Sequence, residues 1–199
     1  LQFGKVCGAQ SKGGLSDLLV ILGYDIISNE YGYAGFNARL GAPTGSRPNS
    51  EFLFEPIVGN GKHWEFGLGF AGRGLIWEKD GLHELNIFID ANFTHYFKAR
   101  QCRSFDLCAN GFGSRYTLLK EFNNNEIYDE KLLPTINVTT LPCDVLVALQ
   151  FEFLFMFGYT YNGWVFDIGY NGWLRSKEKI NLCGSLEENT YGLKGIQDV

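Results

Sequence analysis

The chain has 199 residues, of which 45% are hydrophobic, 16% aromatic and 20% charged, and its formal net charge is -5. The length suits a single domain, 1–199, and the absence of a basic field argues against nucleic acid as a partner. No apolar run approaches twenty residues, which excludes a transmembrane helix but not a transmembrane barrel, whose apolar residues occupy every second position.

The first part of the chain predicts a weak strand over 1–10 and then a hairpin. The sequence begins at Leu1 without an export segment, which indicates either a removed signal peptide or an excerpt of a longer protein. Apolar and polar residues alternate over 15–28 and again over 32–42, with a short turn at 29–30. Period two over such lengths predicts strands.

The next segment predicts a long loop and a second hairpin. Residues 43–62 contain three prolines and several glycines, so they are expected to form a loop. Alternation resumes over 63–77 and 82–100, on either side of a Lys-Asp-Gly turn at 79–81.

The stretch 101–144 is the longest one with little periodicity, apart from a short alternation over 115–122, and it is predicted to be a loop. The chain contains five cysteines, an odd count without metal-site spacing. Cys102 and Cys108 are close enough in sequence to close a small disulfide loop, which would persist only in an oxidising compartment.

The stretch 145–177 predicts the longest hairpin. Its two arms alternate on either side of Asn162-Gly163, a dipeptide that favours a type I′ turn. A third loop is expected at 178–189 and a further strand from 190 to 199, which gives about eight strand segments in all.

The loop lengths favour a transmembrane barrel over a soluble one. Short turns at 29–30, 79–81 and 162–163 alternate with the long loops 43–62, 101–144 and 178–189. In an up-and-down antiparallel sheet, the short turns therefore lie at one end and the long loops at the other, as in outer-membrane barrels. The predicted fold is all-β, an up-and-down antiparallel transmembrane β-barrel that is either complete with eight strands or part of a larger barrel.

Four stretches also resemble a known class of proteins: FEPIVGNGKHWEFGLGF (54–70), IDANFTHYFKARQCRSFDL (89–107), NGFGSRYTLLKEF (110–122) and YNGWVFDIGYNGWLRSKEKI (161–180). They resemble porin-like outer-membrane β-barrel proteins of Gram-negative-type bacteria, a family without an assigned chemistry. The resemblance covers most of the chain and implies a bacterial outer-membrane location.

The alternation assigns residues to two environments. The face expected to line an aqueous lumen carries both signs of charge, as a passive pore for small polar solutes needs: Asp25, Asn37, Arg39, Glu65, Arg73, Asp90, Asn92, Lys98, Glu152, Asp167, Asn171 and Arg175. The face expected to meet outer-membrane lipids is apolar: Phe66, Phe70, Ile87, Ile89, Phe151, Phe153, Phe155, Phe157, Phe166 and Ile168.

The sequence predicts no enzyme activity, catalytic residue, cofactor or metal site, because its three histidines show no ligand or base spacing. The predicted function is a porin-like passive channel or a structural barrel. The alternative is a soluble antiparallel β-barrel that binds an apolar ligand, with the phenylalanine face inward. A homo-oligomer is left open.

Overall fold

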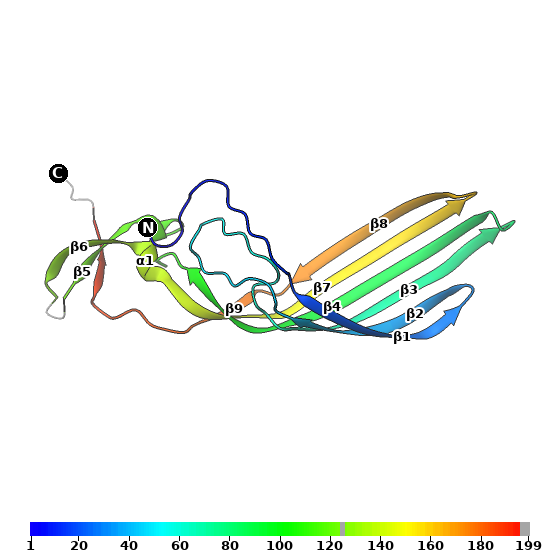
Figure 1. Ribbon diagram of the computed structural model, residues 1–199, viewed down its shortest axis with the longest axis horizontal. Helices are drawn as coiled ribbons and strands as arrows, with labels where there is room; N and C mark the ends of the chain where they lie inside the picture. Colours follow the sequence, from blue (N-terminus) through cyan, green and yellow to red (C-terminus); the bar gives the residue numbers. More distant parts are fainter. Residues whose placement is uncertain (124–125, 196–199) are drawn as a thin grey trace.

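The computed structural model describes residues 1–123 and 126–195, and it is all-β with antiparallel sheets (Figure 1). Its main sheet contains six long strands in the order β1-β2-β3-β4-β7-β8, and β9 pairs with β7 beyond the end of β8. The strands are β1 (Leu18–Asn29), β2 (Gly32–Ala42), β3 (Glu65–Lys79), β4 (His83–Ser104), β7 (Thr140–Tyr161), β8 (Trp164–Arg175) and β9 (Glu178–Leu182).

Tight turns join the strands of each hairpin, as expected from the sequence. Asn162 and Gly163 both have positive φ, 42° and 82°, as a type I′ turn requires. Asp80 and Gly81 also have positive φ, 56° and 61°. In the first turn, the side-chain oxygen of Asn29 accepts hydrogen bonds from the backbone N–H groups of Tyr31 (3.0 Å) and Gly32 (3.1 Å). All three tight turns lie at the same end of the sheet (Figure 1).

The register divides the main sheet into an apolar face and a polar face. One row runs from Leu22 through Ala38, Leu68 and Phe93 to Phe151, and the next from Tyr24 through Phe36 and Phe70 to Ala91 and Phe153. Between the levels of Leu85 and His95 on β4, this apolar face carries no Asp, Glu, Lys or Arg in any of the six described strands. Between these levels, the charged residues of the strands lie on the other, polar face.

Two β-bulges shift the alternation near the long-loop end of the sheet. The β4–β7 register shifts between Thr94 and Tyr96 and again between Tyr96 and Ala99. Within the second shift, Lys98 forms an ion pair of 3.2 Å with Asp144, on the opposite side from buried Ala99. Lys98 was expected on the polar face, and the extra residue of the bulge turns its side chain to the other face.

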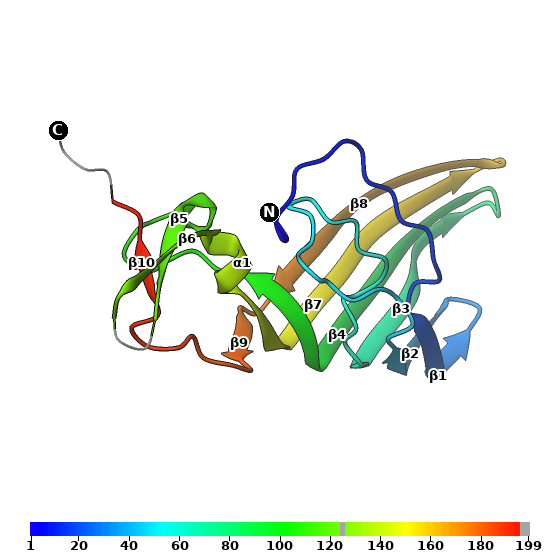
Figure 2. The same cartoon turned by 60° about the vertical axis from the view of Figure 1, so that its left-hand side comes forward.

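A small lobe occupies the segment that was expected to be a loop. It contains a 3₁₀ turn (Ser114–Tyr116), β5 (Leu118–Phe122), β6 (Tyr128–Pro134), the short helix α1 (Thr135–Thr139) and β10 (Tyr191–Leu193). These strands form a second sheet in the order β10-β5-β6, at the end of the molecule away from the tight turns (Figures 1 and 2). The loop predictions for 101–144 and 178–189 therefore need correction, because β4, β7 and β9 also extend into them.

The chain before β1 and the 43–62 loop pack near the small lobe instead of extending the sheet (Figure 2). The strand expected over 1–10 is reduced to an isolated parallel bridge between Lys5 and Phe52. The backbone N–H of Gln2 donates to the side-chain oxygen of Asn137 in α1 (2.9 Å). The further strand expected over 190–199 is limited to β10, and 196–199 lie outside the described residues.

The main sheet is open at both edges. Within the described residues, β1 pairs only with β2, and β8 pairs only with β7 along its length. All twelve residues of β1 are exposed. None of the helices in the described part of the chain is long and apolar enough to cross a membrane.

One glycine on the apolar face makes room for an aromatic ring. Gly172 of β8 lies opposite Phe153 of β7, and a Cβ atom at Gly172 would overlap that ring. We expect Gly172→Val to lower the free energy of unfolding by about 1–3 kcal/mol, the usual effect of overpacking. Denaturant unfolding checks this, with Gly184→Val as the control because a Cβ there meets no atom within 4 Å. Equal destabilisation by both variants would contradict the expectation.

Candidate functional site

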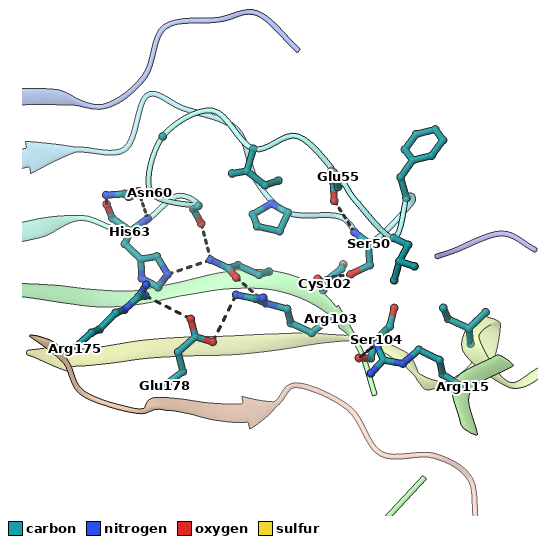
Figure 3. Close-up of a pocket in the computed structure, with 18 residues that line it drawn as sticks. Ser50, Glu55, Asn60, His63, Cys102, Arg103, Ser104, Arg115, Arg175 and Glu178 are labelled. Atoms are coloured by element: carbon teal, nitrogen blue, oxygen red, sulfur yellow. Dashed lines mark hydrogen bonds and ion pairs between the residues drawn. The ribbon is translucent and has the colours of Figure 1, made fainter. Parts of the chain in front are cut away.

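A cavity of about 490 Å³ lies where the 43–62 loop crosses β4 at the long-loop end of the sheet (Figure 3). Its walls come from this loop, from β4 residues 101–104, from the junction between β8 and β9, and from two side chains of the small lobe. Hydrogen bonds to Cys102 help to fix the loop to β4: Cys102 N–H donates to the carbonyl of Pro48 (3.2 Å), and the Ser50 hydroxyl donates to the carbonyl of Cys102 (2.8 Å).

A buried pair of polar side chains forms the floor of this cavity. His63 and Gln101 are each 2% exposed. His63 Nδ1 lies 2.7 Å from the carbonyl of Phe97, which can only accept, so we assign the proton of the neutral ring to Nδ1. His63 Nε2 then accepts from Gln101 Nε2 (3.0 Å), which also donates to the carbonyl of Gly61 (2.8 Å).

The same network continues to two arginines that line the cavity. Arg103 Nε donates to Gln101 Oε1 (3.0 Å), and its terminal nitrogen lies 3.6 Å from Glu178. Arg175 approaches the other oxygen of Glu178 at 3.4 Å, and its guanidinium lies 5.7 Å from the ring centre of Tyr96. Figure 3 shows Glu178 between the two arginines. One carboxylate is therefore shared by two guanidinium groups.

Two further charged groups at the cavity are held by other partners. Arg115 forms a bidentate ion pair with Asp106, at 2.6 and 2.9 Å, and also donates to the carbonyl of Ser104 (3.1 Å). The Glu55 carboxylate accepts hydrogen bonds from the backbone N–H groups of Asn49 and Ser50, each at 3.0 Å. These contacts leave Arg103, Arg175 and Glu178 as the charged groups that face the cavity without a closer partner.

The Arg115–Asp106 pair gives the small lobe a pH dependence. Hydrogen bonds from the Arg115 side chain, and then from its backbone N–H, hold the pKa of Asp106 well below its ordinary value of 3.8. Because this pKa is lower in the folded chain, the pair stabilises the lobe above pH 3.8, and the stabilisation is lost as the pH falls below that value.

We expect Asp106→Asn to speed amide hydrogen exchange in β5 at neutral pH. The difference from the parent protein should shrink once the pH falls below 3.8, where Asp106 begins to be protonated in the unfolded chain. Asp129→Asn is the control, because Asp129 pairs with Lys131, whose side chain is 61% exposed, and such pairs contribute little. Equal effects of both variants would contradict a specific role for Asp106.

The predicted lumen residues form a polar face, but only one of them lines the cavity. Apart from Lys98, all of them lie on the polar face in the strand register. Some contact each other: Arg39 donates to Asn37 (2.8 Å) and Asn92 donates to Asp90. Arg175 is the member that also lines the cavity.

The predicted lipid-facing residues all share the apolar face, and several remain open to solvent in the structure. Exposure is 58% for Phe166, 74% for Ile168 and 40% for Ile89. Phe151 and Phe153 are half-buried by stacking on neighbouring rings, with centroid separations of 4.5 Å to Phe93 and 5.6 Å between the two.

Four residues of this site were not predicted from the sequence: His63, Gln101, Arg103 and Glu178. Gln101 and Arg103 continue the alternation of β4 beyond its bulge, so the signal lay in the residues that were assigned to a loop. Cys102 and Cys108, expected as a disulfide, are free thiols in this structure, as are the other three cysteines. Cys102 lies within β4, and its backbone is engaged by the 43–62 loop, whereas Cys108 lies exposed in the following turn.

The described residues contain no cluster of three or more His, Cys, Asp or Glu side chains that could hold a metal ion. Comparisons with protein-family models, with curated proteins and with solved structures gave no match, so the sheet and its cavity are interpreted from their own geometry.

Proposed function

We propose that the main sheet is the wall of an outer-membrane β-barrel that acts as a passive channel for small polar solutes. The observation that carries this proposal is the continuous apolar face, which runs across six strands and is not covered by any other described layer of the chain. Soluble monomers rarely expose apolar patches of more than a few hundred Å². A lipid-facing wall has this pattern, with its polar residues on the opposite face.

The height of the apolar face supports the proposal. On β4 it extends from Leu85 to Phe97, about thirteen residues. At about 3.3 Å per residue and a tilt of about 45°, this gives roughly 30 Å, close to the hydrocarbon thickness of a bilayer. Beyond Phe97, the same face carries the charged side chains of Lys98, Arg100 and Asp144.

Aromatic residues mark the other limit of the apolar face, near the tight turns. His83 stacks on Tyr161 with ring centres 4.4 Å apart, and Tyr161 pairs across the hairpin with Trp164, which is 68% exposed. Trp77 is 45% exposed and lies opposite Leu85. Outer-membrane barrels carry such aromatic girdles where the wall meets the lipid head groups.

The proposal requires partners for both edges of the sheet. Lipid offers no hydrogen-bond partner, so the free backbone groups of β1 and β8 must pair with other strands in the membrane. Because the six strands alternate in direction, β1 and β8 run in opposite directions. The sheet therefore stays antiparallel if β8 of one copy pairs with β1 of another copy. It also stays antiparallel if an even number of further strands lies between β8 and β1.

Reconstitution tests the proposed function directly. The full chain, refolded in detergent and added to a planar bilayer, is expected to give discrete conductance steps, and its unheated form should migrate differently from the heated form on a detergent gel. A protein that is monodisperse in plain buffer and does not enter vesicles would contradict the proposal. That result would favour the alternative, a soluble barrel whose apolar face encloses a ligand.

A further inference from the structure

We infer that the cavity between β4, the β8–β9 junction and the 43–62 loop binds small anions with a carboxylate or phosphate group, held by Arg103 and Arg175 in the place of the Glu178 carboxylate. This deepens the proposed function by naming the solute class of the channel. It depends on that function for the route of the solute, whereas the binding step can be measured without a membrane.

The contacts of Glu178 indicate a site that is occupied by an internal anion. Its two oxygens lie 3.6 Å from Arg103 and 3.4 Å from Arg175, whereas close bonds between a guanidinium and a carboxylate measure about 2.7–2.9 Å. Each guanidinium has five donors. Arg103 uses one of them on Gln101, so both arginines keep donors that can reach an incoming anion.

The charge balance at this position favours an anion. Arg115 is neutralised by Asp106, whereas Glu55, on the 43–62 loop, keeps its negative charge and accepts hydrogen bonds from two backbone N–H groups. In the cluster of Arg103, Arg175 and Glu178, two guanidinium groups face one carboxylate, which leaves one excess positive charge at this position. The side chains of Arg103, Arg175 and Glu178 are 39%, 33% and 33% exposed, so solvent and small solutes can reach them.

Both arginines are held in place by groups behind them. Gln101 accepts a hydrogen bond from Arg103 and is itself bonded to the buried His63 ring. The ring of Tyr96 lies against the guanidinium group of Arg175. Such preorganisation lowers the entropic cost of binding. The cavity volume of about 490 Å³ lies within the range of small-molecule sites and accommodates a small organic anion.

Calorimetric titration of the full chain in a zwitterionic detergent tests the site, with inorganic phosphate and citrate as probes. We expect Arg175→Gln and Arg103→Gln each to weaken binding by about tenfold or more, since each removes charge-assisted hydrogen bonds. Glu178→Gln should tighten binding several-fold, because it removes the competing carboxylate. Weaker binding by the arginine variants together with tighter binding by Glu178→Gln would distinguish a binding site from a purely structural ion-pair network. In such a network, each of these changes would only destabilise the fold.

Arg100→Gln is the matched control. Arg100 lies on the same strand as Arg103 but pairs with Asp144 on the opposite face, with its side chain 61% exposed. It should leave binding unchanged. Heat-modifiable migration of every variant confirms folding. Absence of phosphate and citrate binding by the parent protein, weaker binding by Glu178→Gln, or an equal loss in Arg100→Gln would overturn the inference.

Bilayer measurements separate this inference from the proposed function. Under a salt gradient, the reversal potential of the parent channel should indicate anion preference, and Arg175→Gln should reduce it. Anion binding that depends on Arg175, without any conductance, would overturn the channel and leave the site standing. Conductance without anion binding would overturn the site and leave the channel standing.

Discussion

Phe155→Arg is expected to lower the stability of the protein in lipid vesicles by about 2–4 kcal/mol, the usual cost of an arginine on the lipid face of a barrel near the bilayer centre. Phe155 lies between Ile89 and Tyr170 on the apolar face and is 37% exposed. The matched variant is Leu154→Arg, one residue away. Leu154 lies between Asp90 and Asn171 on the polar face, where an arginine gains a carboxylate partner, so its effect should be small.

Urea unfolding in vesicles measures the two variants, and fluorescence separates a lipid environment from a dry protein core. Tryptophan placed at 155 should be quenched by brominated lipid chains, beyond the quenching of the native tryptophans, whereas tryptophan placed at 154 should not be. In a soluble barrel with its phenylalanines inside, position 155 would be protected from the brominated chains. That result, or stronger quenching at 154 than at 155, would contradict the lipid-facing assignment.

Much of the main sheet could be predicted from the sequence, because period-two alternation directly reflects the geometry of a strand. The strand expected over 32–42 has the bounds of β2, and the long hairpin turns at Asn162-Gly163 as expected. The division of the sheet into an apolar and a polar face could also be predicted from the sequence. Alternate side chains of neighbouring strands must share a face once the tight turns fix the register.

The bulges were not predictable, and they decide the face of the residues that follow them. An extra residue leaves no mark on composition, but it reverses the inward and outward positions beyond it. Lys98 was therefore expected on the wrong side of the sheet, and Gln101 and Arg103 were assigned to a loop. The strand expected from residue 190 contains β10, but the small lobe itself was not predicted, since β5 and β10 are short and pair across a long sequence separation.

The edges and the cavity depend on tertiary structure that alternation does not encode. A strand at an edge has the same sequence period as a central one, so an open sheet and a closed barrel give the same pattern. His63 meets Gln101 only because the 43–62 loop crosses β4. Arg175 and Glu178 are three residues apart, but their meeting with Arg103 requires β9 to continue along β7 where β8 ends.

Gln101→Leu is expected to lower the free energy of unfolding by about 2–4 kcal/mol. The change leaves His63 Nε2, the carbonyl of Gly61 and Nε of Arg103 without their partner, and each buried polar group left unsatisfied costs about 1–3 kcal/mol. The sum is reduced because water in the adjacent cavity can replace the contact with Arg103, which is partly exposed.

Denaturant unfolding in detergent measures this effect, with Gln10→Leu as the control because the exposed Gln10 amide makes one local bond to the carbonyl of Cys7. The control should change stability by less than about 0.5 kcal/mol, as surface substitutions usually do. Because Gln101 also holds Arg103, Gln101→Leu should weaken phosphate binding in proportion to the mobility that Arg103 gains. A stable Gln101→Leu protein would show that His63 and Gln101 do not support the cavity floor.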